Sequence, residues 1–311
     1  MATEEALAVA ERVLRAACGD RVRVGFPLAP LTTFRLGGPA ALYLEAEGED
    51  DLDAAALAIA EAEIPWLVLG KGSNVLVADE GFPGLVLRLG RSFRWAGRAG
   101  ERLAAGGAMP LPALAGIALR HGLAGLEFGV AIPGSLGGAV RMNAGAHGTE
   151  IAAVLTEVRV VRLVARQRRA IAARDIDFGY RRAGLAPDAV VTEATVRLEP
   201  GDPAVIRERM EAARSWRRRT QPLAEPNCGS VFTNPPGAHA ARLIEEAGAK
   251  GLAEGGARVS DKHANFIVAG PGARARDVAR LIERVRSLVR DRTGVELVPE
   301  VRLVGRFGDG P

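Results

Sequence analysis

A short apolar strand, a glycine-rich turn and a second apolar strand decide the fold of this chain: Trp66-Leu67-Val68-Leu69, Gly70-Lys71-Gly72-Ser73-Asn74 and Val75-Leu76-Val77. Glycine at a strand end lets backbone N–H groups approach a ligand closely, and several such groups together bind an anion. A strand follows this turn, whereas the Rossmann fingerprint requires a helix after its glycines. The stretch therefore predicts a phosphate-holding turn outside the Rossmann fold.

A second turn of the same kind lies at Ile132-Pro133-Gly134-Ser135-Leu136-Gly137-Gly138-Ala139, within the segment 128–148, which is dense in glycine and alanine. One glycine-rich turn alone is more often a tight bend than a ligand site. Two such turns, each with a serine and apolar flanks, favour a pyrophosphate ligand. Neither fits the P-loop pattern, because no Gly-Lys-Ser/Thr sequence opens a helix.

The bulk composition is that of a globular protein without a membrane span. A chain of 311 residues can bury a core of its own, and its length predicts two or three domains. No apolar run approaches the roughly 20 residues that cross a bilayer. The acidic, amphipathic N-terminus differs from a signal peptide, so we expect a cytoplasmic protein. Cys18 and Cys228 are too few for a disulfide framework or a four-ligand zinc site, and we expect no metal.

The net charge of +4 would suit nucleic acid or small phosphate-bearing ligands equally, but the distribution of the basic residues makes nucleic acid the weaker interpretation. Only three of the 41 basic residues are lysine, and the arginines are interleaved with acids. The densest basic run, Arg217-Arg218-Arg219, ends a predicted helix, where cations meet the helix dipole favourably. We expect neither a nucleic-acid nor a membrane partner, and we expect a monomer.

Hydrophobic periodicity and turn residues place the main elements. Asp51 is expected to cap a helix that ends at Glu61, and Pro222 with Pro226 breaks the chain near a domain boundary at 200–225. Further helices are predicted over 3–17, 111–121, 207–219, 239–247 and 275–292, and strands over 66–69, 75–77, 156–164, 189–198, 265–269 and 295–303.

A third turn, Pro226-Asn227-Cys228-Gly229-Ser230-Val231-Phe232-Thr233-Asn234-Pro235, carries a serine after a glycine. Such a serine can be a nucleophile, a proton donor or a hydroxyl that bonds its own backbone. The nucleophile is disfavoured because no G-x-S-x-G elbow aims the hydroxyl. Cys228 is interpreted as a buried, inert cysteine.

Seven motifs occur in the order found in one family, and the chain resembles UDP-N-acetylenolpyruvoylglucosamine reductase from about Leu31 to Gly305. The motifs are Thr33-Phe34-Arg35-Leu36-Gly37-Gly38, GKGSN at 70–74, IPGSLGGAV at 132–140 with Asn143-Ala144-Gly145-Ala146, Phe178-Gly179-Tyr180-Arg181, GSVFTNP at 229–235, Ser260-Asp261-Lys262-His263-Ala264-Asn265-Phe266 and Pro299-Glu300-Val301-Arg302.

The resemblance implies an α+β protein, with a two-subdomain FAD-binding fold of the vanillyl-alcohol-oxidase (PCMH) type and a C-terminal α+β substrate-binding domain. It implies a lead-in over 1–30, FAD-binding subdomains over 31–90 and 91–205, and a substrate domain over 206–311. The chain matches the shorter subtype, which lacks an extra tyrosine-bearing loop. FAD is expected to be non-covalent, because the N-terminal flavin turn has no histidine or cysteine.

The resemblance also implies the reaction, which belongs to peptidoglycan precursor synthesis. NADPH gives a hydride to FAD, and the enolpyruvyl β-carbon of the UDP-sugar then receives one. Arg181, Ser230 and Glu300 occupy the family's catalytic positions. An always-charged guanidinium suits the negative charge that builds up beside the substrate carboxylate. Ser230 is the candidate proton donor to the α-carbon, and Glu300 the candidate for holding the geometry or relaying the proton.

Residues at the other motif positions are expected to bind ligands. The expected substrate-binding residues are Tyr180, Arg219, Asn234 and His263. The expected cofactor-binding residues are Arg35, Gly70, Lys71, Gly72, Ser73, Asn74, Val75, Leu76, Pro133, Gly134, Ser135, Gly137, Gly138, Ala139, Asn143, Ala144 and Gly145.

Simpler interpretations of several of these residues remain open. Arg181 or Arg182 can be a surface cation paired with Asp175 or Asp177. Glu300 can face solvent, His263 can be structural, and Asn234 can be an ordinary turn residue. Thr233 stands where many relatives have lysine, and Lys71 can add charge near the pyrophosphate. Another oxidase of the same fold, or a non-catalytic nucleotide-binding relative, is the competing functional hypothesis.

Overall fold

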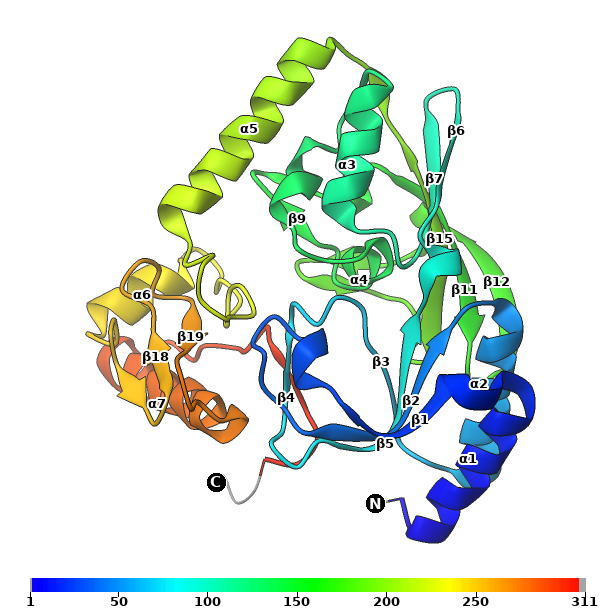
Figure 1. Cartoon of the computed structure of the whole chain (residues 1–311). Helices are drawn as coiled ribbons and strands as arrows, with labels where there is room; N and C mark the ends of the chain where they lie inside the picture. Colours follow the sequence, from blue (N-terminus) through cyan, green and yellow to red (C-terminus); the bar gives the residue numbers. More distant parts are fainter. Residues whose placement is uncertain (1, 308–311) are drawn as a thin grey trace. The chain divides into compact units, whose positions relative to one another are not determined.

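The computed structural model describes residues 2–307, which form two compact units (Figure 1). Unit 1 comprises the residues up to Val24, Leu42–Lys71 and Gly84–Trp216, and unit 2 comprises Gly25–Ala41, Gly72–Pro83 and the residues from Arg217 onward. The four-part division expected from the sequence stays a prediction, and its outermost residues, 1 and 308–311, lie outside the described part. No helix within residues 2–307 is long and apolar enough to cross a membrane.

The N-terminal part of unit 1 packs two helices against one face of a sheet. Alternate strand residues, Leu42, Leu44, Leu85 and Leu87, share a core with these helices, because successive strand side chains point to opposite faces. The helices are α1 (Glu4–Cys18) and α2 (Glu49–Ala62), and the sheet has the order β1 (Val22–Pro27), β2 (Pro39–Ala46), β5 (Phe82–Leu89) and β3 (Trp66–Val68).

The larger part of unit 1 is an antiparallel five-stranded sheet with its own core, shown in cyan and green in Figure 1. The strands follow the order β12 (Gln167–Ala172), β11 (Leu155–Arg162), β15 (Ala189–Arg197), β7 (Arg102–Gly106) and β6 (Ala96–Ala99). Two helices and three pairs of short strands complete this part of unit 1. The helices are α3 (Leu111–Arg120) and α4 (Leu136–Arg141). The strand pairs are β8 (Leu123–Ala124) with β16 (Glu199–Pro200), β9 (Gly145–Ala146) with β10 (Thr149–Glu150), and β13 (Phe178–Gly179) with β14 (Arg182–Ala183).

Unit 2 has a core built on one long amphipathic helix. Leu281, Ile282, Val285 and Val289 recur at helical spacing along α7 (Ala275–Thr293) and are buried. The Asp79 carboxylate accepts the N–H groups of Ala275 and Arg276 at 2.8 and 3.1 Å and so caps this helix. The remaining elements are α6 (Ala240–Glu246), the sheet β17 (Ala253–Glu254), β18 (Ala257–Val259) and β19 (Ile267–Ala269), and the parallel pair β4 (Val75–Val77) and β20 (Arg302–Val304). Helix α5 (Pro203–Thr220) ends in this unit.

Most predicted elements are confirmed, and the turn at 70–74 does lie between two strands, β3 and β4. Two predictions are wrong in extent. Helix α5 begins at Pro203, because proline is well tolerated in the first helical turn. The strand expected over 295–303 is limited to Arg302–Val304, with one isolated bridge between Pro299 and Phe232, since proline has no N–H to continue a ladder.

The prediction that Asp51 caps α2 is wrong, because the helix begins two residues before it, at Glu49. Its carboxylate is buried and accepts the N–H of Glu47 at 2.7 Å, the Arg21 guanidinium at 2.7 Å and the Cys18 thiol at 3.3 Å. Burial opposes ionisation, but the hydrogen bonds from Arg21 and Glu47 outweigh it and lower the pKa of Asp51. Asp51 thus ties α1 to α2.

We predict that Asp51→Ala lowers the free energy of unfolding by about 2 kcal/mol, because it leaves the partners of a buried carboxylate unsatisfied. The control is Asp50→Ala, at the exposed neighbouring residue, which should lower the free energy of unfolding by less than about 0.5 kcal/mol. Since the folded-state pKa of Asp51 is lowered, its stabilisation is present at neutral pH and is lost as pH falls below about 4. Urea unfolding at neutral and acidic pH measures both effects. Equal losses for the two variants would contradict this role.

Candidate functional site

The two glycine-rich turns meet in unit 1. A Cβ atom added to Gly70 would lie 2.8 Å from Oγ of Ser135, closer than real Cβ contacts allow. Ser135 is buried, and its Oγ accepts the N–H of Gly138 at 3.3 Å at the start of α4. The structure therefore brings together, as neighbours, two turns that lie more than 60 residues apart in the sequence.

The second turn is held by backbone contacts from the segment before α3. Leu136 donates its N–H to Met109 O at 2.8 Å, and Gly137 donates to Gly107 O at 2.9 Å. A Cβ atom at Gly137 would lie 3.0 Å from Val191 O, so this glycine lets the turn pack closely against β15. Sequence reasoning missed α4 itself, because two of its six residues are glycine, which disfavours a helix.

Asn143 uses its side chain to join backbone segments. It is fully buried, its Nδ2 donates to Gly179 O at 3.1 Å, and its Oδ1 accepts the N–H of Ala152 at 3.1 Å. Its φ of 41° is a conformation that few side chains adopt without cost. Asn143 thereby anchors the hairpin that carries Arg181.

Arg181 lies in the two-residue turn of the β13–β14 hairpin and has a φ of 56°. Its Nη1 donates to Gly145 O at 3.3 Å, and its guanidinium carbon lies 5.2 Å from the centroid of the exposed Tyr180 ring. The ion pair with Asp177, at 2.8 Å, belongs to Arg182. A left-handed backbone conformation at a non-glycine residue such as Arg181 is costly, and such conformations are typical of functional sites.

The second half of the first turn lies in unit 2 and is equally constrained. A Cβ atom at Gly72, which has a φ of 62°, would lie 2.2 Å from Leu31 O. Gly72 O accepts the N–H of Thr33 at 3.0 Å. The TTFRLGG loop therefore wraps this turn, and it leaves the side chain of Arg35 exposed at a φ of 56°. Leu76, expected to contact the cofactor, has its side chain in the core of unit 2.

Ser230 and Glu300 belong to two segments that lie side by side in unit 2. Glu300 donates its N–H to Val231 O at 2.7 Å, and Phe232 forms an antiparallel bridge with Pro299. Both candidate catalytic side chains are half-buried. Asn74, in the glycine-rich turn, donates from Nδ2 to Glu300 O at 3.0 Å. The turn, the serine segment and the glutamate segment thus form one arrangement.

Cys228 is buried beside this arrangement, as the sequence predicted. Burial, and then the negative charge of Glu300, raise the pKa of the Cys228 thiol. The thiol therefore stays protonated and unreactive.

Asn265 clamps the serine segment from the opposite side, a role that sequence reasoning missed. Its Oδ1 accepts the N–H of Phe232 at 2.9 Å, and its Nδ2 donates to Phe232 O at 2.8 Å. Its backbone O accepts the N–H of Val231 at 2.9 Å. The only sequence signal was its place in the motif at 260–266.

Two of the expected substrate-binding side chains have structural partners. The Nδ1 atom of His263 accepts the N–H of Asn265 at 3.2 Å, and burial lowers the pKa of this imidazole. Oδ1 of Asn234 accepts the N–H of Ala240 at 3.0 Å, at the start of α6. Arg219 is exposed near the end of α5. These contacts explain the positions of His263 and Asn234 without a ligand, and their roles in substrate binding stay predictions.

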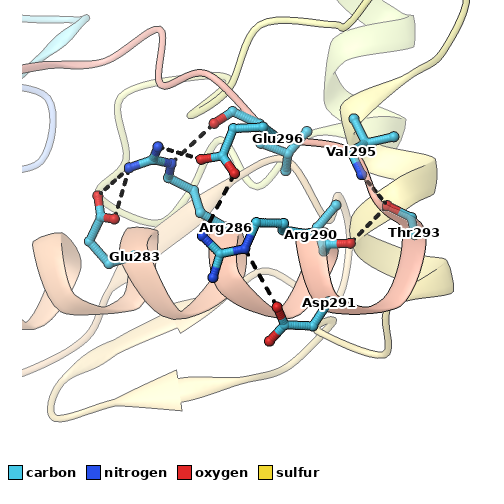
Figure 2. A network of polar contacts seen from close by, with 9 residues as sticks. Glu283, Arg286, Arg290, Asp291, Thr293, Val295 and Glu296 are labelled. Atoms are coloured by element: carbon cyan, nitrogen blue, oxygen red, sulfur yellow. Dashed lines mark hydrogen bonds and ion pairs between the residues drawn. The ribbon is translucent and has the colours of Figure 1, made fainter.

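A polar network at the end of α7 fixes the chain that leads to Glu300 (Figure 2). Arg286 donates from Nε to Leu297 O at 3.1 Å and from Nη2 to Glu296 at 2.6 Å, and it pairs with Glu283 at 2.8 Å. Arg290 makes longer contacts, at 3.9 Å to Glu296. Arg286 is therefore the main attachment of this segment to the helix.

Comparisons with known proteins agree with this arrangement. Residues 221–304 match the C-terminal domain of UDP-N-acetylenolpyruvoylglucosamine reductase, and residues 40–166 match an FAD binding domain. A protein of Heliobacterium modesticaldum named UDP-N-acetylenolpyruvoylglucosamine reductase is 47% identical over 284 residues, which cover 91% of this chain and 90% of that protein. The chain belongs to the UDP-N-acetylenolpyruvoylglucosamine reductase family. It is an FAD-dependent oxidoreductase.

Solved structures show the same fold. The family member from Thermus caldophilus superposes with a TM-score of 0.79 at 36% identity, over 91% of this chain and 98% of that one. A glucose dehydrogenase, Phl p 4.0202, superposes with a TM-score of 0.50 at 12% identity, over 64% of this chain and 45% of that one, which indicates a shared fold alone. The predicted α+β architecture, an FAD-binding fold followed by a C-terminal domain, is confirmed.

The residues of the two turns fit FAD. Gly70 has no side chain and its backbone lies against the Ser135 hydroxyl, and a Cβ atom at Gly134 would meet no atom closer than 3.8 Å. Bare backbone beside a hydroxyl is the kind of surface that a diphosphate binds. The GKGSN turn and the turn at 132–139 would hold this group.

We predict that Gly70→Ala weakens FAD binding at least about tenfold, because the new methyl group displaces the Ser135 hydroxyl from the cradle. Gly116→Ala is the control, since a Cβ atom at this position on α3 would contact nothing within 4 Å. Flavin content after purification and titration of the apoprotein measure the effect. Unchanged affinity in Gly70→Ala would show that the meeting of the turns is not a cofactor site.

We predict that Arg286→Ala loosens the segment 295–301, because it removes the bonds to Glu296 and Leu297 O. Amide exchange at Glu300 should accelerate and the free energy of unfolding should fall by about 2 kcal/mol. The matched control is Arg290→Ala, whose contacts are long and exposed and should contribute less than about 0.5 kcal/mol. Similar amide exchange at Glu300 in both variants would refute the role of Arg286 as the attachment of this segment to α7.

Proposed function

We propose that the protein reduces UDP-N-acetylenolpyruvoylglucosamine to UDP-N-acetylmuramate with NADPH as the reductant, as a step in peptidoglycan precursor synthesis. The observation that carries the proposal is the pairing of the Ser230 and Glu300 segments through Glu300 N–H and Val231 O, within a family of this name. Bound FAD supplies the transfer of a hydride from NADPH to the enolpyruvyl β-carbon.

Arg181 stabilises the charge that develops in the reaction. Adding a hydride to the β-carbon pushes electron density toward the substrate carboxylate, as an enolate-like species. A guanidinium remains charged at all working pH values and forks onto two carboxylate oxygens. The Gly145 carbonyl and the Tyr180 ring hold the Arg181 side chain in place before substrate binds.

Ser230 completes the reduction by donating its hydroxyl proton to the α-carbon. One hydride at the β-carbon and one proton at the α-carbon together convert the double bond to a single bond. Glu300, on the neighbouring segment, holds the geometry or returns a proton to Ser230. Asn265 and Arg286 keep these two segments in register.

The remaining polar residues are proposed to orient the UDP-sugar. Tyr180 and Arg219 are exposed, which leaves them accessible to a substrate. The bond described above for Asn234 involves Oδ1, and that for His263 involves Nδ1. Where many relatives have lysine, Thr233 uses its hydroxyl on Val298 O at 3.2 Å, so the arginines at 217–219 are the proposed source of positive charge.

We predict that the enzyme, once reduced by NADPH without oxygen, is reoxidised by the enolpyruvyl substrate, and that Ser230→Ala selectively slows this second half-reaction. The expected loss is at least about a hundredfold, because proton donation contributes that much to a rate. Flavin absorbance in stopped flow measures each half-reaction separately.

The control is Ser287→Ala, a serine on α7 outside both segments, which should leave both half-reactions unchanged. Wild-type enzyme that is not reoxidised by the substrate would refute the reductase assignment. An equal loss in both half-reactions of Ser230→Ala would show that this serine is not the proton donor.

A further inference from the structure

One arginine on α4 contacts the chain just after the β13–β14 hairpin, and the proposed mechanism gives it no role. Arg141 is the last residue of α4, and its Nη1 donates to Leu185 O at 3.0 Å and to Ala186 O at 2.9 Å. Its Nη2 donates to Ala189 O. A planar guanidinium with several N–H groups in a fixed arrangement suits three carbonyls at once. Arg141 thus holds the whole segment 185–189 against α4.

The segment 185–189 depends on such contacts, because residues 184–188 belong to no helix or strand. Backbone carbonyls outside regular structure need other donors when they are removed from water. At the far end of the segment, the buried Asp188 carboxylate accepts the N–H groups of Val164 and Ala165 at 3.1 and 3.2 Å, in the turn that follows β11. Arg141 holds the end that lies next to the hairpin.

That end is also the base of the hairpin that carries Arg181. Gly184 donates its N–H to Asp177 O at 2.8 Å and so closes the hairpin, in which Phe178 pairs with Ala183. A two-stranded hairpin is marginally stable by itself, so its position depends on the contacts that hold its ends. A displacement of the base would therefore displace Arg181 in the turn.

The stretch of chain that begins with Arg141 holds the same hairpin at two further points. Asn143 donates to Gly179 O in the first strand, and Gly145 O accepts from Arg181 in the turn. This stretch directly follows α4, which begins in the second glycine-rich turn. Helix α4 therefore connects the proposed cofactor turn to the hairpin of the candidate catalytic arginine.

We propose that Arg141 is a positioning residue for Arg181: it fixes the base of the β13–β14 hairpin to α4, so that the Arg181 guanidinium lies where the enolate-like charge develops. Such a group stabilises charge best when it is in place beforehand, and a misplacement of about 1 Å can slow a reaction about a hundredfold. Arg141 acts through the carbonyls that it binds and not through a contact with the substrate. It lies between the motif stretches 132–140 and 143–146, so the order of the motifs assigned it no role. The inference rests on the proposed role of Arg181 in the reduction.

The test measures the two half-reactions separately in holoenzyme that carries Arg141→Met, which keeps an apolar stem but removes the donors. Reoxidation of the reduced flavin by the enolpyruvyl substrate should slow about tenfold, because Arg181 acts in that step. The rate of flavin reduction at saturating NADPH should be unchanged. Arg141→Lys, which keeps the charge and one donor nitrogen, should regain part of the lost rate. The control is Arg174→Met, at an exposed arginine shortly before the same hairpin, and it should change neither rate.

Combination with Arg181→Met distinguishes positioning from general damage. If Arg141 acts through Arg181, adding Arg141→Met to Arg181→Met should slow reoxidation no further, whereas independent effects multiply. A further tenfold loss in the double variant, about the loss expected of Arg141→Met alone, overturns the proposal. An equal loss in both half-reactions of Arg141→Met also overturns it.

Amide exchange gives a second measurement that needs no substrate. The Gly184 N–H closes the hairpin, so its exchange should accelerate in Arg141→Met and stay unchanged in Arg174→Met. Thermal unfolding and flavin content show whether each variant is folded, and should Arg141→Met not fold, Arg141→Lys and Arg174→Lys replace the pair. Unchanged exchange at Gly184 overturns the proposal even in an enzyme that reduces its substrate. Wild-type enzyme that the substrate does not reoxidise refutes the proposed function instead, and the exchange at Gly184 still decides whether Arg141 holds the hairpin.

Discussion

The Gly70 α-carbon and the Ser135 hydroxyl leave no room for a side chain between them, and the proposed cofactor site of unit 1 depends on this approach. Each turn is fixed independently of the other. The second turn is tied to the segment before α3 by Leu136 and Gly137, and the first follows the short strand β3. Backbone groups held this firmly are preorganised for an anion, because they lose little freedom when it binds. Glycine at these positions therefore serves close packing as much as conformational freedom.

The candidate catalytic groups of unit 2 are positioned through backbone contacts. Ser230 lies on a segment that bonds Glu300 on one side and Asn265 on the other. Glu300 lies on a segment that Arg286 and Asn74 hold from opposite ends. The main chains of Ser230 and Glu300 are thus fixed by their neighbours. Neighbouring residues that hold the backbone of the candidate catalytic residues are typical of sites that require a precise geometry.

The sequence predicted the elements whose signals are local. Helices α1 and α7 have strong apolar periodicity, and the order of the motifs identified the family and the fold. Helix α4 was missed because its glycines mask it, and it forms because Ser135 caps it and Arg141 bonds the carbonyls of Leu185 and Ala186. The partners of Asp51 were also beyond sequence reasoning, since Arg21 lies 30 residues away. Contacts between residues that lie far apart in the chain produce no periodic pattern in the sequence.

The candidate site shows the same limit. The motifs named Ser230, Glu300 and Arg181, but they gave no indication that Arg182, rather than Arg181, pairs with Asp177. They also gave no sign of Arg286, which lies in no motif and acts through Leu297 and Glu296. Side chains that position others are recognised only when their contacts are known, whereas chemistry-bearing side chains are recognised by type and order.

The most direct measurement of the central claim is the identity of the product. Purified holoenzyme incubated with NADPH and UDP-N-acetylenolpyruvoylglucosamine should yield UDP-N-acetylmuramate, seen by mass spectrometry as the substrate plus the mass of dihydrogen, with NADPH consumed in equal amount. Unchanged substrate, in a preparation whose flavin NADPH does reduce, would contradict the account.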